Sequence, residues 1–309
     1  MRVLLLGPNG QLGYDIRRAH EETGTPFELV PLPRDRLDVA TPGAVERALD
    51  GFAFDAVVNC TSYHKTDEVE DNATLAFAVN AHAVQAMARA CASKRARLFH
   101  ISTDYVFGGD LAHAQPWRED DRTLPINVYG ASKAMGETLA CLAYDNVVIL
   151  RVASLFGIAG ASGKGGNFVE TIIRVAREKR ALRVVDDQIM SPTFTSDVAR
   201  IVLRMLTDDC APGLYHVVNT GSASWFEFAL EIVRRAGIVA EVASCRSAEY
   251  PTRAARPHYS VLDNAKVSAT FEPMSPWQDA LERYLRAKGH VTGKHIFESE
   301  CEISGRASA

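Results

Sequence analysis

The chain has 309 residues, of which 47% are hydrophobic and 23% charged, as is typical of a folded globular protein with one large core or a core and a smaller appended domain. The net charge of −4 excludes the strongly basic character that nucleic acids and anionic membranes attract, so neither is expected as a partner. Six scattered cysteines without a CxxC pair predict free thiols in a reducing compartment, and the apolar run at 1–7 is too short for a signal sequence or a membrane span. We therefore expect a cytoplasmic protein, a monomer or a homodimer.

The first half of the chain alternates short apolar runs with longer amphipathic stretches, the pattern of a doubly wound, parallel α/β sheet of the Rossmann type. The runs are apolar enough to be buried on both faces, as parallel strands are. We expect strands over residues 2–6, 27–31, 56–60, 97–102 and 147–152. Helices are expected over 12–23, 42–49, 73–93 and 129–143, the second of them capped by Thr41 and starting at Pro42.

After residue 152 the pattern loosens, which indicates a second, smaller module. It opens with a Gly-, Ser- and Lys-rich loop at 157–167, either a surface loop or a flap over the substrate, in which Lys164 could meet a diphosphate. The pieces expected after this loop are helices at 168–178, 195–206 and 225–236 and strands at 182–186 and 214–218. We predict a dinucleotide-binding domain over 1–153, open to a later strand, a mainly substrate-binding domain over 154–287 and a disordered tail over 288–309.

A glycine-rich turn follows the first expected strand and opens the first expected helix. There, backbone N–H groups and the positive end of the helix can face the pyrophosphate of a dinucleotide. The residues predicted to form this cradle are Gly7, Gly10, Gln11, Leu12 and Gly13. The spacing is GxxGxxG rather than the commoner GxGxxG, but the mechanics are the same.

Further cofactor contacts are expected where the second and third strands end. Arg34 follows the second strand, where its guanidinium can pair with a 2′-phosphate and so favour NADPH. Asp35 or Asp38 could instead bind a free ribose hydroxyl, so NADPH and NADH both stay open. The other residues predicted to line the cofactor are Val39, Cys60, Thr61, Ser62 and Asn80.

The chemistry of a carbonyl reduction is available at the end of the fourth strand and on the helix that follows. Tyr129 and Lys133 are four residues apart, so they project from one helix face, and an ammonium near a phenol lowers its pKa. Ser102, Thr103 and Asp104 leave the fourth strand at its carboxyl end, the edge where such sheets bind ligands. Hydroxyl, phenol and ammonium groups are therefore expected to converge on one reacting carbon.

Several motifs in this order resemble the extended short-chain dehydrogenase/reductase family. They are GPNGQLG, NCTS, STDYVFGG, NVYGASKAMGE and MSPTFTSDVA, within residues 1–285. The resemblance is greatest to members that reduce the 4-keto group of a dTDP-linked 6-deoxy sugar. It implies NADPH- or NADH-dependent conversion of dTDP-4-dehydro-L-rhamnose to dTDP-L-rhamnose.

The resemblance also implies roles for single residues. Tyr129 would donate a proton to the ketone oxygen, and Lys133 would bind the nicotinamide ribose and lower the Tyr129 pKa. Thr103 would hydrogen-bond the developing oxyanion, Asp104 would orient the sugar beside Ser102, and Arg256 would meet the diphosphate.

The sequence departs from the family at one place and leaves alternatives open. Ser154 stands where some members carry a tryptophan near the sugar, and Trp225 is interpreted as a core residue at a helix start. Asp15 occupies a position that binds magnesium in some members, which makes it a single, weak candidate for a metal ligand. The alternative functions are another nucleotide-sugar 4-ketoreductase or epimerase, or a non-catalytic NADP-binding regulatory subunit similar to the β subunit of methionine adenosyltransferase.

Overall fold

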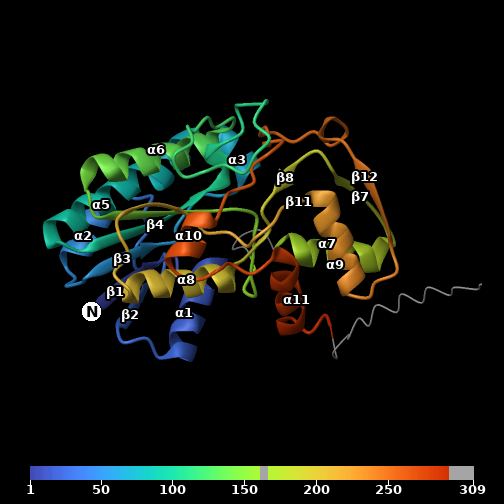
Figure 1. Cartoon of the computed structure of the whole chain (residues 1–309). Helices are drawn as coiled ribbons and strands as arrows, with labels where there is room; N and C mark the ends of the chain where they lie inside the picture. The colour runs from blue at the N-terminus through green and yellow to red at the C-terminus, as the bar shows by residue number, and fades with distance from the viewer. Residues whose placement is uncertain (161–165, 292–309) are drawn as a thin grey trace, which may run out of the picture.

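A six-stranded, wholly parallel sheet forms the larger part of the molecule (Figure 1). The structure is a computed structural model that describes residues 1–160 and 166–291. The strand order is β10-β5-β4-β3-β1-β2. The strands are β1 (Arg2–Leu6), β2 (Glu28–Leu32), β3 (Ala56–Asn59), β4 (Arg97–Thr103), β5 (Val147–Val152) and β10 (Gly213–His216). The expected Rossmann-type sheet is thus confirmed.

Helices cover both faces of this sheet, because its central strands are apolar on both sides. In β1, Val3 and Leu5 pack with one group of helices, while Leu4 and Leu6 pack with the other. The first face is covered by α1 (Gln11–Thr23) and α8 (Thr195–Thr207). The second face is covered by α2 (Ala44–Asp50), α5 (Ala83–Lys94) and α6 (Val128–Ala143). Figure 1 shows these two helical layers above and below the strands.

The strand order reverses beside β1. β2 lies on one side of β1, and the chain then crosses to place β3 on the other side. Ligands of such sheets bind at the carboxyl ends of the strands where this reversal occurs. The glycine-rich turn after β1 and the segment after β3 meet at this point.

Two glycines of α6 allow it to approach its neighbours closely. A Cβ at Gly130 would overlap the carbonyl oxygen of Tyr105, and one at Gly136 would overlap that of Asn80. Asn80 lies in a π-helical turn, Ala78–His82, which joins α4 (Ala73–Phe77) to α5. The helix expected over 73–93 is therefore present, with one π-helical turn inside it.

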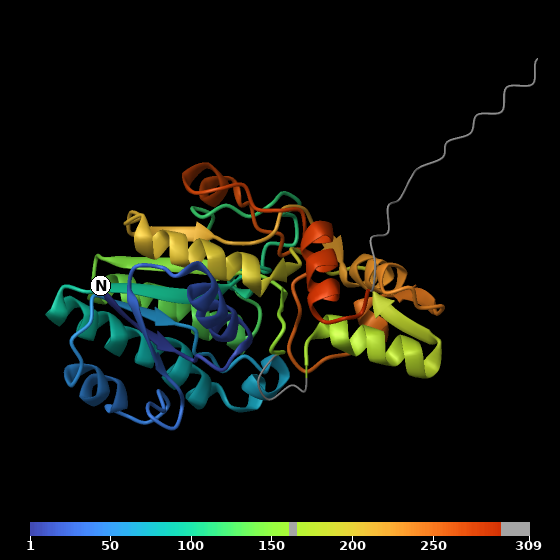
Figure 2. The ribbon, with the colours of Figure 1, turned by 90° about the horizontal axis from the view of Figure 1, so that it is seen from below.

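The second module is built from short strand pairs and three helices, with α11 beside the sheet layer in both views (Figures 1 and 2). The helices are α7 (Phe168–Lys179), α9 (Trp225–Arg235) and α11 (Trp277–Ala287). The strand pairs are β7 (Ala181–Val185) with β12 (Glu241–Cys245), β8 (Ile189–Met190) with β11 (Ala223–Ser224), and β6 (Leu155–Phe156) with β9 (Thr193–Phe194). The remaining short helices are α3 (Thr66–Asp71), α10 (Ala265–Thr270) and the 3₁₀ turns Asp104–Val106 and Ser247–Glu249.

Two segments that the sequence pattern assigned to the second module belong instead to the sheet layer. Helix α8 packs against α1, and β10 extends the sheet beyond β5. The predicted boundary was open to a later strand, which β10 is, but not to a later helix such as α8, because both pairings join residues far apart in the sequence. Helix α2 also begins later than expected, at Ala44, and its N-cap is Gly43 with a φ of 70°, so Thr41 and Pro42 do not start it.

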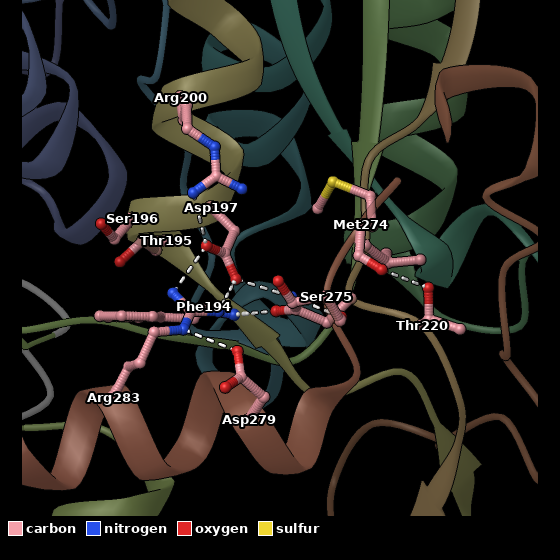
Figure 3. A network of polar contacts seen from close by, with 12 residues as sticks. Phe194, Thr195, Ser196, Asp197, Arg200, Thr220, Met274, Ser275, Asp279 and Arg283 are labelled. Carbon is pink, nitrogen blue, oxygen red and sulfur yellow. Dashed lines mark hydrogen bonds and ion pairs between the residues drawn. The ribbon is translucent and has the colours of Figure 1, made fainter. Parts of the chain in front are cut away.

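An ion pair on a buried carboxylate joins the second module to the sheet layer (Figure 3). Asp197 of α8 is fully buried and accepts two hydrogen bonds from the guanidinium of Arg283 of α11, at 2.8 and 2.7 Å. Asn219 donates to the same carboxylate at 2.7 Å and accepts from the Phe194 N–H at 2.8 Å. Three segments distant in the sequence, at 194–197, 219 and 283, are therefore connected around one carboxylate.

Some expectations concern residues outside the described ranges. Lys164 and most of the tail at 288–309 lie there. Within the described residues, the five cysteines are free thiols, and none of the helices is long and apolar enough to cross a membrane.

Candidate active site

A cavity of about 520 Å³ opens at the carboxyl edge of the sheet, between the sheet layer and the second module. Most of the predicted site residues line it. They are Gly10, Gln11, Leu12, Gly13, Cys60, Thr61, Ser62, Ser102, Thr103, Asp104, Tyr129, Lys133 and Arg256. The second module contributes residues such as Asn167, Phe168 and Trp225. The fold thus brings the cofactor, catalytic and substrate predictions to one cavity.

The glycine-rich turn has the geometry of a dinucleotide cradle. Gly7 has a φ of +74°, and a Cβ there would lie 3.0 Å from the backbone carbonyl of Cys60. A Cβ at Gly13 would overlap the carbonyl oxygen of Gly7, so turn and helix can pack this closely only without side chains. Gly10 caps α1 without a side-chain hydrogen bond, which leaves the first N–H groups of the helix for an anion. The buried Oε1 of Gln11 has no hydrogen-bond partner among the described residues. These features fit a dinucleotide pyrophosphate.

The residues predicted around the adenosine lie outside the lining of this cavity. Arg34 is exposed after β2 and pairs with the Asp38 carboxylate at 3.1 Å. The other Asp38 oxygen accepts from the Ala40 N–H at 3.1 Å, and Val39 packs against the core beneath α2. Roles for these residues in recognising a ribose or a 2′-phosphate stay predictions.

Asn80, also predicted to meet the cofactor, is buried and shapes the segment after β3. Its Oδ1 accepts from the Tyr63 N–H at 2.9 Å and from the Ser62 hydroxyl at 3.3 Å. Its Nδ2 donates to the Ser132 hydroxyl of α6 at 3.0 Å. Asn80 therefore positions Ser62, which lines the cavity.

Tyr129 lies beside the hydroxyls of Thr103 and Ser62, which act to lower the pKa of its phenol. Burial outweighs them and raises the Tyr129 pKa to about 12. The Lys133 amine donates to the Ile101 carbonyl at 2.6 Å and lies 3.1 Å from Nε2 of His100. Burial lowers the Lys133 pKa to about 8.

The expected lowering of the Tyr129 pKa by Lys133 is therefore absent from this arrangement. The physical reason is that the Lys133 amine is bonded to β4, and burial dominates the environment of the phenol. At neutral pH, Tyr129 keeps its proton.

Thr103 and Asp104 form a buried hydrogen-bonded group next to Tyr129. The Thr103 hydroxyl donates to Oδ1 of Asp104 at 3.1 Å and accepts from the Tyr105 N–H at 3.2 Å. The Ser260 hydroxyl donates to Oδ2 of Asp104 at 2.6 Å. Burial raises the Asp104 pKa to about 6, although these hydrogen bonds oppose the shift. Ser260, to which the sequence analysis gave no role, thus fixes the carboxyl.

Ser102, predicted to bind substrate, directs its hydroxyl elsewhere. It donates to Oε1 of Glu137, and this carboxylate also binds the Arg151 guanidinium at 2.9 and 2.7 Å. All three side chains are buried. The hydroxyl of Ser102 therefore holds β4 against α6.

Arg256 and Trp225 both line the cavity. Arg256 pairs with Asp67 of α3 at 2.7 Å, and Asp67 also accepts from the Ala254 N–H at 3.0 Å. Trp225 begins α9, as expected, but it is only partly buried and its ring lies 4.6 Å from that of Phe168. The assignment of Trp225 to the core was thus incomplete, because one part of the indole faces the cavity.

Asp15 is buried at the interface of α1 and α8. Its carboxylate accepts from the Thr195 hydroxyl, and burial raises its pKa. Over the described residues, no group of three or more His, Cys, Asp or Glu side chains is placed to hold a metal ion. Magnesium binding by Asp15 stays a prediction.

These features are united by one reaction class, the transfer of a hydride between a nicotinamide and a carbonyl carbon with a phenol as proton carrier. The fold and the site thus define an NAD(P)-dependent oxidoreductase, as the sequence motifs predicted. The family model described as RmlD substrate binding domain matches residues 1–289, and the chain belongs to this family.

Known proteins agree with this assignment. The chain is 35% identical over 287 residues to the spore coat polysaccharide biosynthesis protein SpsK of Bacillus subtilis. The aligned region covers 93% of this chain and 98% of that protein. It is 34% identical to the solved structure of a dTDP-4-dehydrorhamnose reductase from Clostridium acetobutylicum, with a TM-score of 0.86 over 93% of this chain and 99% of that one. The same enzyme from Bacillus anthracis, solved in complex with NADP, is 33% identical with a TM-score of 0.85 and the same coverage. The resemblance inferred from the sequence and the use of NAD(P)H are confirmed.

Proposed function

We propose that this chain reduces the 4-keto group of dTDP-4-dehydro-6-deoxy-L-mannose (dTDP-4-dehydro-L-rhamnose) to give dTDP-L-rhamnose. The observation that carries the proposal is the convergence of Thr103, Tyr129 and Lys133 on one cavity beside the glycine-rich turn. The dinucleotide would be held by this turn and would supply the hydride when bound. NADPH and NADH both suit the site, with Arg34 favouring NADPH.

Tyr129 serves as the proton donor. Its phenol is neutral at physiological pH because burial raises its pKa to about 12, so the proton needed by the ketone oxygen is present at Oη. Its hydroxyl lies beside those of Thr103 and Ser62, which line the same cavity. The edge of its ring packs against Tyr105, with centroids 5.8 Å apart, which restricts rotation.

Thr103 and Asp104 orient the ketone and its sugar. In the ligand-free arrangement the Thr103 hydroxyl donates to Asp104, so a substrate oxygen would compete with that carboxyl for the same hydrogen. Protonation of Asp104 releases the Thr103 hydrogen toward the cavity. Lys133 would bind the ribose of the cofactor through its amine.

The remaining length of the cavity suits a nucleoside diphosphate. Arg256 supplies a guanidinium for the diphosphate once it leaves Asp67, and Phe168 and Trp225 offer ring faces for a base. Ser154 also lines the cavity, with a small side chain and a φ of 42°. We therefore place the sugar on the side of the cavity that Ser154 lines.

The test is a coupled reaction followed at the nicotinamide absorbance band. Purified protein is mixed with NADPH and enzymatically prepared dTDP-4-keto-6-deoxy-glucose, with and without the epimerase that supplies the L-configured ketone. We expect oxidation only with the epimerase, and rhamnose after hydrolysis of the product. Oxidation without the epimerase would assign another 4-keto sugar. NADPH binding without oxidation of either sugar would contradict the proposal and favour the regulatory-subunit alternative.

A further inference from the structure

The amine of Lys133 ends a buried chain of polar groups that starts at the backbone after β3. The Thr61 N–H donates to Oδ1 of Asn59 at 3.0 Å, and the Thr61 hydroxyl donates to the same oxygen at 2.6 Å. Nδ2 of Asn59 lies 3.1 Å from Nδ1 of His100, and Nε2 of His100 lies 3.1 Å from Nζ of Lys133. Asn59 and His100 are completely buried and Lys133 nearly so.

The direction of hydrogen bonding along this chain is fixed at its start. A backbone N–H can only donate, so the atom of Asn59 that faces Thr61 must be the carbonyl oxygen. The amide nitrogen of Asn59 therefore faces His100 and can only donate to it. Nδ1 of His100 must then accept, which places the single proton of the neutral ring on Nε2.

This tautomer presents an N–H, and not a lone pair, to Lys133. A neutral amine can accept from that N–H while it donates to the Ile101 carbonyl at 2.6 Å. An ammonium has three donors and no acceptor, so its hydrogen would oppose that of His100. The neutral form of Lys133 is the one that completes the chain.

The other ionisable groups near Lys133 do not favour its neutral form. Glu137, one turn along α6, and the Cys60 thiol after β3 both favour the ammonium. Tyr129 on the same helix face is a neutral phenol. Burial lowers the His100 pKa well below its usual range, with Lys133 adding to the effect, so His100 does not take the proton itself.

We propose that Asn59 and His100 are positioning residues that disfavour the ammonium of Lys133 in the cofactor-free protein, so that binding of a dinucleotide is coupled to uptake of one proton at Nζ. A ribose hydroxyl would offer the ammonium an acceptor that His100 withholds. The proposed role of Lys133 at the ribose enters only this last step; the tautomer of His100 is independent of the reaction.

The first test is ¹⁵N NMR of the histidine rings in the cofactor-free protein, with His100 assigned by the loss of its signals in His100→Gln. We expect a protonated Nε2 and an unprotonated Nδ1 at pH 8. A proton on Nδ1, or on both nitrogens, would overturn the proposal. This readout needs no substrate, so it can fail while the reductase function stands.

The second test is the pH dependence of NADH affinity, since NADH lacks a 2′-phosphate that titrates. We expect affinity to fall by up to tenfold per pH unit between about pH 8.5 and 9.5, as one linked proton requires. Asn59→Asp can accept from Nδ1–H, which reverses the tautomer and turns a lone pair toward Lys133. The slope should then shrink to less than twofold per unit.

The matched control is His216→Gln, which alters a buried histidine of β10 that contacts Arg151 rather than Lys133. It should keep the slope of the native protein. An unchanged slope in Asn59→Asp, with the protein folded by circular dichroism, would overturn the coupling. Should Asn59→Asp fail to fold, His100→Gln replaces it, since its side-chain amide can turn an oxygen toward the ammonium.

Discussion

At the scale of single residues, the phenol of Tyr129 leads to a prediction that separates catalysis from cofactor binding. Tyr129→Phe removes the proton donor but leaves the ring in place against Tyr105. We expect kcat to fall by about 10²- to 10⁴-fold, with the NADPH dissociation constant within twofold of the native value. Stopped-flow absorbance and cofactor fluorescence measure the two quantities.

Tyr144→Phe is the control, because it makes the same change at the other end of α6, against the core beneath that helix. Its kcat should match that of the native protein. A Tyr129→Phe variant that retained full kcat would remove Tyr129 from the chemistry.

The raised pKa of Asp104 leads to a prediction about the stability of the protein. Its pKa is raised from 3.8 to about 6 by burial, so the folded state holds this proton more tightly than the unfolded chain does. The free energy of unfolding therefore contains a contribution that is lost as pH rises from about 4 to 6, worth at most about 3 kcal/mol. Asp104→Asn lacks this contribution and can keep the bonds to Ser260 and Thr103.

Urea unfolding of both proteins at pH 4.5 and 7 measures the effect. The stability of Asp104→Asn relative to the native protein should be higher at pH 7 than at pH 4.5. A difference that was equal at both pH values would show that Asp104 does not titrate in this range.

At the scale of elements, the close approach of α6 to its neighbours depends on glycine. A Cβ at Gly136 would overlap the Asn80 carbonyl oxygen, and backbone cannot move aside as a flexible side chain can. We expect Gly136→Ala to lower the free energy of unfolding by about 2 kcal/mol. Thermal or urea denaturation measures this.

Thr138→Ala, on the exposed side of the same helix, should change stability by about 0.5 kcal/mol or less. If Gly136→Ala were as harmless as this control, α6 and the π-helical turn would not be packed as described.

The ion pair between α8 and α11 leads to a second prediction at this scale, about the free energy of unfolding. Arg283→Met removes the bidentate partner of the buried Asp197 carboxylate and leaves only Arg200, 3.5 Å away, which should cost about 3 kcal/mol of stability. Arg174→Met, which breaks an exposed pair with Glu178 on α7, should cost about 0.5 kcal/mol or less.

The double variant Arg283→Met with Asp197→Asn should recover part of the loss, because it removes the buried charge that Arg200 alone, at 3.5 Å, would otherwise have to balance. Urea midpoints compare the three proteins. A double variant less stable than Arg283→Met alone would show that Asp197 does not need a cation there.

At the scale of the whole molecule, the cavity links the sheet layer to the second module, so a bound cofactor stabilises the fold by mass action. NADPH at 100 times its dissociation constant should add about 2.7 kcal/mol. Arg34→Ala should weaken NADPH by about tenfold and leave NADH within twofold, because only NADPH carries the 2′-phosphate. Calorimetric titration measures both affinities.

Arg36→Ala, on the same loop but with its guanidinium over the ring of Phe52, is the control and should leave both affinities near the native values. Equal losses for NADPH and NADH in Arg34→Ala would assign Arg34 a role other than phosphate recognition.

The sequence by itself determined the elements whose signal is local. The apolar runs of β1, β3 and β5 and the helical pattern of α6 predicted their positions within a residue or so, because strands buried on both faces leave no polar alternation. The four-residue spacing alone placed Tyr129 and Lys133 on one face of α6. The glycine-rich turn could be recognised from its own residues, without knowledge of any contact with a distant part of the chain. These local signals sufficed for the Rossmann-type sheet and for the residues that gather in its cavity.

The tertiary structure decided everything that depends on pairing over long sequence separations. It placed α8 and β10 in the sheet layer, turned Ser102 toward Glu137 and joined Asp197 to Arg283, 86 residues apart. It also placed His100 and Asn59 behind Lys133, where a strand pattern shows only two polar residues among apolar ones. Burial supplies the physical reason: desolvation and hydrogen-bond partners set the pKa of a side chain and the direction in which it points, and a local pattern carries neither.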